Sequence, residues 1–252
     1  MKPISILMYH QVGHFPNMKE HRATYCDLGR FRRQMKWLGL AGYSVISLDQ
    51  AVSELRQNRH AEQKRVVLTF DDAYENFYEN AFPILGEMGY PATVYAIAGM
   101  VGKKADWLAA DGHHTPRLMN AVQLRQVQAS GITVGSHSFH HIRLAEQDSD
   151  TIAQETTDSK AALEDILGAA VEHFCYPYGS HDRRCVQAVK AAGYATATTC
   201  QRAAATARFD PHALPRKAIS FGDSLPGYWW KVVGKNEPKQ APVVIEAIGA
   251  GA

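Results

Sequence analysis

Two adjacent carboxylates and a cluster of imidazoles are the residues of this sequence best suited to act together on a substrate. Asp71 and Asp72 directly follow one apolar run, and His137, His140 and His141 follow another. The i, i+4 spacing of His137 and His141 brings two imidazoles to one face of a helical turn, where they can share a divalent metal ion. With one carboxylate they would form the three-ligand site, with an open position, of a hydrolytic zinc enzyme.

Each of these groups also has an ordinary structural interpretation. Asp72 could cap a helix that begins near Tyr74, because Asp is favoured at helix N-termini. The chain has 12 His residues, and a single His is more often a surface or hydrogen-bonded residue than a ligand. Three His within five positions after a strand favour a metal site. His140 fits less well than His141, because both cannot reach ideal geometry with His137.

A third group, residues 174–179 (FCYPYG), places a Pro-aromatic-Gly turn after another apolar run. Pro177 has no N–H, so the Tyr178 amide is the candidate hydrogen-bond donor to an oxyanion. The same turn could instead be plain structural punctuation.

The elements that must position these residues are short apolar runs alternating with segments of helical period. We expect strands at residues 4–8, 66–70, 92–97, 132–135, 173–176, 195–199 and 217–221. Helical spacing predicts helices at 28–38, about 74–88 and about 150–167, with Gly89 and Gly168 ending the last two. This alternation predicts an α/β barrel of about seven strand–helix units. Its chemistry should lie at the carboxyl ends of the strands.

Composition and charge narrow the classes of function. Apolar residues make up 46% and charged residues 21%, as in soluble globular enzymes. The 27 basic and 25 acidic residues give a formal charge of +2 without a basic stripe, so nucleic acid is not an expected partner. No apolar stretch reaches about 18 residues, so no membrane-spanning helix is expected.

The N-terminus and the cysteines bear on the compartment. The first residues lack the core and cleavage site of a signal peptide, which favours a cytoplasmic protein, although a trimmed exported protein would look the same. The four Cys residues are irregularly spaced without a Cys-x-x-Cys pair, which favours free thiols.

The motifs TFDD at residues 69–72, HSFHH at 137–141 and YPYG at 176–179 occur in this order along the chain. Together they resemble the polysaccharide deacetylase family, carbohydrate esterase family 4, with its NodB-homology domain. The resemblance covers about residues 4–220 and implies a distorted (β/α) barrel. We assign the barrel to residues 1–234, and the polar and small residues at 235–252 predict a partly mobile tail. It also implies a deacetylase that releases acetate from an N-acetylglucosamine-type substrate.

Roles for individual residues follow from the resemblance. It implies Asp72, His137 and His141 as ligands of one divalent ion, with Zn²⁺ the preferred candidate. Asp71 would then take a proton from the attacking water, and the Tyr178 amide would complete the oxyanion hole.

The sequence departs from the family pattern in three places. Many relatives begin the third motif with an Arg that orients the base, where this chain has Phe174-Cys175, and Ala73 replaces the usual Gly after the two acids. No His follows His212, so the C-terminal Leu-x-His that supplies the catalytic acid in much of the family is absent.

Two replacements for these missing groups are available. Residues 7–10 (LMYH) resemble the opening strand of the circularly permuted poly-N-acetylglucosamine deacetylase subgroup, which implies His10 as the acid. Arg216, just before the last strand, could supply a guanidinium to Asp71. A buried structural His10 and a surface Arg216 are the alternatives, and His181 is a competing acid.

Other functions remain open on the sequence alone. The same metal site could act on a small cyclic amide or an O-acetyl ester, and the missing acid could mark a carbohydrate-binding domain without catalysis. A glycosidase is disfavoured, because its carboxyl groups lie about 5–9 Å apart and those of Asp71 and Asp72 are adjacent. Trp107 could stack on a sugar or pack on its own helix.

Overall fold

The apolar, β-branched runs form the strands of one curled parallel sheet. A computed structural model of the chain describes residues 3–16, 18, 21–57, 63–111, 115–238 and 241. The sheet contains β1 (Ser5–Tyr9), β4 (Tyr43–Val45), β5 (Lys64–Phe70), β6 (Thr93–Ala96), β7 (Thr133–Ser136), β8 (His173–Cys175), β9 (Thr196–Thr198) and β10 (Lys217–Ala218). Most of their side chains are buried, because strands of such a sheet are covered on both faces.

The order of the strands shows how the sheet curls. It is β10-β1-β5-β6-β7-β8-β9, with β4 paired to the start of β5. Leu7 of β1 lies opposite Leu68 on one side and Lys217 on the other, so the N-terminal strand is internal. Leu214, in the segment that leads into β10, bridges to Thr198 of β9 and narrows the gap between the two edges. The prediction of a distorted (β/α) barrel is confirmed.

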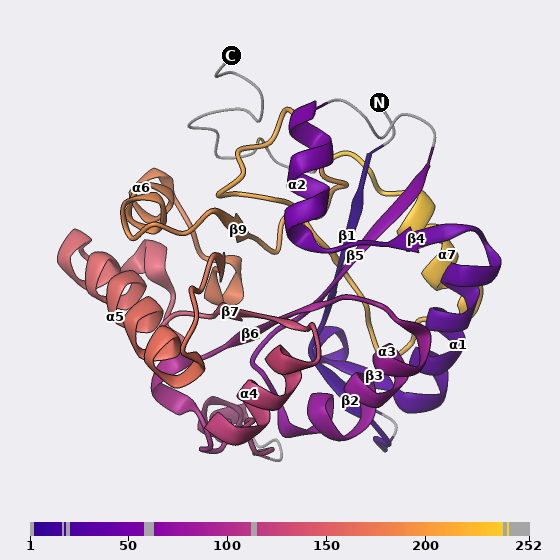
Figure 1. Ribbon diagram of the computed structural model, residues 1–252, viewed down its shortest axis with the longest axis horizontal. Helices are drawn as coiled ribbons and strands as arrows, with labels where there is room; N and C mark the ends of the chain where they lie inside the picture. Colours follow the sequence, from indigo (N-terminus) through magenta and orange to yellow (C-terminus); the bar gives the residue numbers. More distant parts are fainter. Residues whose placement is uncertain are drawn as a thin grey trace.

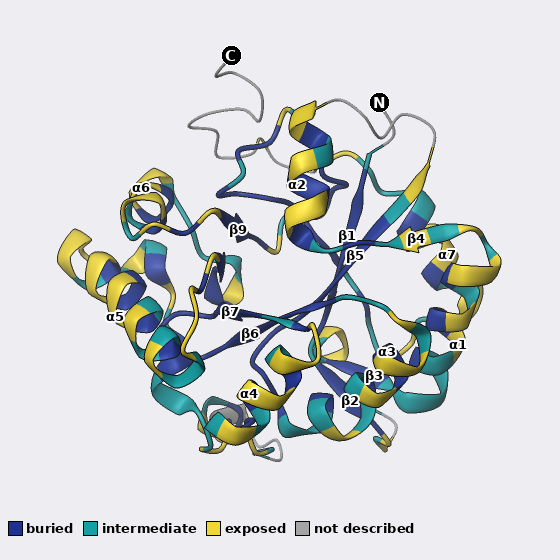
Figure 2. Ribbon diagram, viewed as in Figure 1, coloured by how far each residue is buried: buried dark blue, intermediate teal, exposed yellow. Residues whose placement is uncertain are grey.

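Seven α-helices in the described residues surround this sheet (Figure 1). They are α1 (Leu28–Leu40), α2 (Leu48–Gln57), α3 (Phe82–Met88), α4 (Ala121–Ala129), α5 (Ser149–Leu167), α6 (Arg183–Ala191) and α7 (Leu225–Val233). Figure 2 shows buried residues on the strands and exposed residues on the outer sides of the helices. On α1, for example, Phe31, Met35 and Leu38 are buried against the core.

The helices predicted from periodicity are present with changed bounds. α1 extends the prediction for 28–38 to residue 40, and α5 begins one residue before the predicted 150–167 and ends at Gly168, whose φ is 66°. The single helix predicted for 74–88 is wrong in detail. A π-helix, Phe77–Ala81, precedes α3, and the Phe82 amide donates to the Phe77 carbonyl. Pro83 at the start of α3 cannot join an ordinary α-helical ladder, which accounts for the wider turn before it.

Several elements were not predicted, among them β4, α2, α4, α6 and α7. A second small sheet, β2 (Gln11–Gly13) with β3 (Tyr25–Asp27), continues the chain beyond β1.

The end of the chain is only partly described. The Lys217 ammonium donates to the Gly234 carbonyl and to Asn236 Oδ1, which ties the residues after α7 to β10. The rest of the predicted tail at 235–252, apart from 235–238 and 241, lies outside the described residues. Among the helices that are described, none has the length and apolar character needed to cross a membrane. All four cysteines are free thiols.

Candidate active site

The three groups identified in the sequence meet at the carboxyl ends of neighbouring strands. Asp71 and Asp72 follow β5, His137 follows β7 and Tyr178 lies in the turn after β8. The chain leaves β5 through two left-handed residues, Asp72 with φ 69° and Ala73 with φ 51°. Neighbours on a regular strand point to opposite faces, and this turn lets both carboxylates face the site.

Asp72, His137 and His141 form a set of three donors, called here the buried donor set. Asp72 Oδ1 lies 3.3 Å from the Nε2 atom of each imidazole. The three residues are 4%, 2% and 9% exposed, and Asp72 Oδ1 has no hydrogen-bond partner. A buried carboxylate oxygen without a partner is unfavourable and calls for a ligand. Donors on a tetrahedral Zn²⁺, with bonds of about 2.0–2.1 Å, lie about 3.3 Å apart, so this set fits the ion.

The charge state of Asp72 suits the same role. Burial raises the pKa of its carboxyl, but the imidazoles of His137 and His141 lower it more, so the pKa lies well below its ordinary value. The carboxylate is therefore ionised near neutral pH, which is the form that binds a cation.

The imidazoles are oriented by a loop rather than by a helix. His137 Nδ1 donates to the Cys175 carbonyl at 2.8 Å, which directs Nε2 toward Asp72. The expectation of a helical turn at His137 and His141 is wrong. Residues 137–141 are irregular, with φ of 62° at Ser138 and 60° at His141. These two left-handed residues, and not helical spacing, bring both rings to one carboxylate.

His140 lies outside the donor set. Its Nδ1 is 2.5 Å from Glu155 Oε1, and its imidazole is 67% exposed. The other oxygen of Glu155 accepts from the amides of Phe139 and His140, so this buried α5 carboxylate fixes the loop. Gly99 lies under the same loop, where a Cβ would come within 2.7 Å of the Phe139 carbonyl oxygen.

Arg216 holds Asp71 in a two-pronged ion pair. Its Nη1 is 2.6 Å from Asp71 Oδ1 and its Nη2 is 2.7 Å from Oδ2. Further hydrogen bonds to Thr199 and Thr69 fix the guanidinium, which is 1% exposed. Burial raises the pKa of Asp71, but the Arg216 charge and hydrogen bonds lower it below its ordinary value. The structure thus places the Arg216 guanidinium against Asp71, the carboxylate that the sequence indicates as its partner.

His10 lies near Asp71, on the strand end next to it, and is not one of the three members of the donor set. Its Nε2 is 3.8 Å from Asp71 Oδ2, its side chain is 14% exposed, and its buried Nδ1 has no hydrogen-bond partner. The competing His181 belongs to the turn after β8. Its Nδ1 contacts the Gly179 carbonyl at 2.8 Å, and its ring stacks on Tyr176. His10 is therefore the better placed of the two.

Two aromatic rings flank His141. The Trp107 centroid is 4.5 Å and the Tyr178 centroid 4.7 Å from that of the imidazole. Tyr178 is 45% exposed, its φ is 57°, and the Arg143 guanidinium lies 4.4 Å from its ring centroid. Trp107 thus packs against the donor set and not only on its own helix. The oxyanion role of the Tyr178 amide stays a prediction.

Cys175 is a residue of the site that the sequence analysis did not select. Its thiol lies 3.0 Å from Arg216 Nη2 and 3.6 Å from Asp71 Oδ2. The signal was its place at the end of β8, directly before the turn that contains Tyr178. A small side chain there leaves space for a guanidinium that comes from the other end of the sequence.

The fold and the site together define a class of protein. An α/β barrel that buries two carboxylates and two imidazoles at the carboxyl ends of its strands places general-base and metal-ligand chemistry at the usual position of a barrel active site. The polysaccharide deacetylase family matches residues 58–197, more than half of the chain. The chain belongs to this family, and its membership implies a deacetylase-type hydrolase.

Individual relatives extend this likeness along the chain. YxkH of Bacillus subtilis (strain 168), which carries the family's name, is 27% identical over 221 residues, covering 88% of this chain and 73% of that protein. The poly-β-1,6-N-acetyl-D-glucosamine N-deacetylase of Staphylococcus aureus (strain MSSA476) is 24% identical over 215 residues, covering 82% and 71%. The structure of the Streptococcus pyogenes deacetylase PplD, with acetate, has a TM-score of 0.78 at 24% identity and covers 92% of this chain and 98% of that chain. The fold likeness therefore reaches well beyond residues 58–197.

Proposed function

We propose that the protein is a metal-dependent deacetylase that hydrolyses the acetamide of an N-acetylglucosamine-type sugar. The sugar would be part of a polysaccharide, an oligosaccharide or a glycoconjugate. The observation that carries the proposal is the placement of Asp71, held by Arg216, beside the buried donor set. The name of the Staphylococcus aureus relative supports an N-acetylated sugar as substrate.

The buried donor set would hold one divalent ion. Two imidazoles and one carboxylate suit Zn²⁺ and leave a position open, as catalytic sites require. Bound there, the ion supplies Lewis-acid chemistry, polarising the acetamide carbonyl and lowering the pKa of water.

The residues around the donor set supply the proton transfers. Asp71 stays ionised under the influence of Arg216 and accepts the proton of the attacking water. The Tyr178 amide donates to the oxyanion that develops on the acetyl carbonyl. His10 gives a proton to the sugar nitrogen as the C–N bond breaks, so that a neutral amine leaves.

Tyr178 also offers a surface for the sugar. Its ring is half-exposed beside His141, and the Arg143 guanidinium lies over one face of the ring, which leaves the other face for a ligand. An aromatic face of this kind stacks on the apolar face of a pyranose. Trp107 would extend that surface on the other side of the donor set.

A panel of acetylated compounds tests the proposal. The protein is stripped with a chelator, reloaded with Zn²⁺ and incubated with β-1,4- and β-1,6-linked N-acetylglucosamine oligomers, an O-acetylated sugar and a small cyclic amide. We expect equal amounts of acetate and free amine from an N-acetylglucosamine oligomer, and neither from the Asp72→Ala variant. Faster turnover of the ester or the cyclic amide would favour those activities. Oligomer binding without acetate release would indicate a carbohydrate-binding domain.

A further inference from the structure

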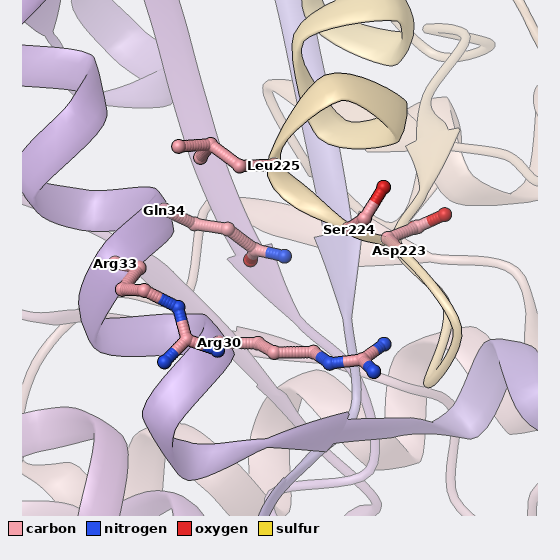
Figure 3. A pocket seen from close by; sticks show the side chains of 6 residues that line it. All are labelled: Arg30, Arg33, Gln34, Asp223, Ser224 and Leu225. Atoms are coloured by element: carbon pink, nitrogen blue, oxygen red, sulfur yellow. The ribbon is translucent and has the colours of Figure 1, made fainter.

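A second pocket, outside the candidate active site, lies between α1 and the start of α7 (Figure 3). Its volume is about 200 Å³. The residues that line it are Arg30, Arg33, Gln34, Asp223, Ser224 and Leu225. No step of the proposed reaction uses any of them.

Gln34 supplies an unsatisfied donor in this pocket. The residue is 2% exposed, and its Oε1 accepts from the Tyr9 hydroxyl at 3.0 Å and faces the Cys26 thiol at 3.8 Å. Both neighbours are donors, so the oxygen is directed to them and Nε2 points toward the pocket, as Figure 3 shows. Nε2 has no hydrogen-bond partner. A buried amide without an acceptor is unfavourable, and an acceptor on a ligand would relieve it.

The charges in the pocket favour an anion. Arg30 gives one N–H to the Phe221 carbonyl at 2.6 Å, and a guanidinium has four more. Arg33 adds a second guanidinium one residue before Gln34. Asp223 offsets only part of this positive charge, because its Oδ2 already accepts from the Lys231 ammonium at 2.6 Å and from the Ser220 amide at 2.7 Å.

The start of α7 adds further positive potential to the pocket. Ser224 is the N-cap of this nine-residue helix, and the positive end of the helix dipole therefore faces the pocket. Pro226 has no N–H and the Gly227 amide donates to Ser224 Oγ, so α7 contributes its dipole rather than a row of free amides. The donors are the two guanidinium groups and the Gln34 amide. A tetrahedral oxyanion can accept from all of them at once.

We propose that this pocket binds a phosphate group, either free or carried on a sugar. The site is separate from the buried donor set and needs neither the metal nor turnover. Its test is therefore independent of the proposed deacetylase activity.

Titration calorimetry on the metal-free full chain tests the site with inorganic phosphate and with N-acetylglucosamine 6-phosphate. We expect saturable binding that Arg33→Gln weakens about tenfold, the effect of losing one charge-assisted hydrogen bond. Tighter binding of the sugar phosphate would assign the phosphate to a sugar, and equal binding would assign free phosphate.

Arg32→Gln is the matched control, because Arg32 lies on the same helix but pairs with Glu87 at 2.6 Å, away from the pocket. It should bind like the wild type. Gln34→Glu keeps the acceptor for Tyr9 but puts negative charge in place of the amide donor, so it should abolish binding, with a thermal melt to check its fold. Lack of saturable binding by the wild type, or equal weakening by Arg32→Gln and Arg33→Gln, would overturn the proposal.

Discussion

Two regions of the barrel gather histidine and carboxylate groups closely enough to share a cation, and they differ in construction. The buried donor set lies at the carboxyl ends of the strands. A second cluster, called here the exposed cluster, lies where β8 begins and is made of the exposed Asp49 and Glu172 with the buried His173. In the exposed cluster, His173 Nδ1 is 2.8 Å from Thr196 Oγ1 and Nε2 is 3.2 Å from Asp49 Oδ1. Both ring nitrogens therefore have partners without a metal ion.

The buried donor set differs in what it leaves unsatisfied. Asp72 Oδ1 has no hydrogen-bond partner, although its neighbours lie 3.3 Å away. The backbone adopts left-handed conformations at Asp72 and His141, which cost free energy at residues other than Gly. Asp49, in contrast, has a side chain that is 57% exposed on an ordinary helix. Histidine and carboxylate side chains can therefore lie close together without forming a metal site. A buried polar atom without a hydrogen-bond partner, held by a strained backbone, distinguishes the buried donor set from the exposed cluster.

Substituting one histidine in each cluster should give the largest difference in metal content and activity between two variants. His137→Ala leaves two of three protein ligands, so metal affinity should fall by at least about 100-fold and acetate release should stop. His173→Ala should retain about one ion per chain and normal activity. Elemental analysis after dialysis measures both, and equal metal loss from the two variants would remove the distinction between the clusters.

Asp71→Asn separates proton transfer by Asp71 from metal binding by the buried donor set. The amide is close in shape to the carboxylate but accepts no proton, so kcat should fall by about 10²–10⁴ with metal content unchanged. Loss of the ion from this variant would mean that Asp71 is itself a ligand.

His10→Ala tests whether the imidazole beside Asp71 is the acid. An amine leaves poorly until it is protonated, so kcat on an N-acetyl substrate should fall by about 10²–10⁴. An activated acetyl ester needs no such proton and should be hydrolysed at close to the wild-type rate. His181→Ala is the control, and a selective amide defect in that variant instead would move the role to His181.

Arg216→Gln should have the smallest effect on rate and a clear effect on pH dependence. Arg216 lowers the pKa of Asp71, so the folded state gains stability from the ionised carboxylate above the ordinary pKa of 3.8, and loses it as the pH falls through the lowered value. Without the guanidinium, the pKa of Asp71 should rise, because burial is then opposed only by the smaller effects of His10 and His137.

Two measurements follow for Arg216→Gln. The acidic limb of the rate profile should move to higher pH, and unfolding at neutral pH should cost about 3–5 kcal/mol less, since a buried charge loses its partner. An unchanged acidic limb would mean that the ionisation of Asp71 does not control the pH dependence of the rate.

The sequence was most informative where the chemistry depends on residue type and strand order. Runs ending in Asp71 or His137 could be assigned to strand ends, and the absence of a C-terminal His directed attention to His10. Arg216 could be proposed as the partner of Asp71 because it precedes the last strand.

Other features of the fold and the site could not be predicted from the sequence. Residue type does not reveal the left-handed φ values at Ser138 and His141, so the i, i+4 spacing predicts a helical turn where the structure has an irregular loop. α7 was missed because its Pro-Gly start looks like a turn, and the pocket beside Gln34 was missed with it. α4 did carry a readable signal, the capping box between Asn120 and Gln123.

Anomalous diffraction from crystals soaked in Zn²⁺ tests the account most directly, because it locates the ion without reference to activity. The account predicts one strong peak at about 2.0–2.2 Å from Asp72 Oδ1 and from the Nε2 atoms of His137 and His141, with no peak at His173. A peak at the exposed cluster alone, or one bound by Asp71 and Cys175 with His137, would contradict it.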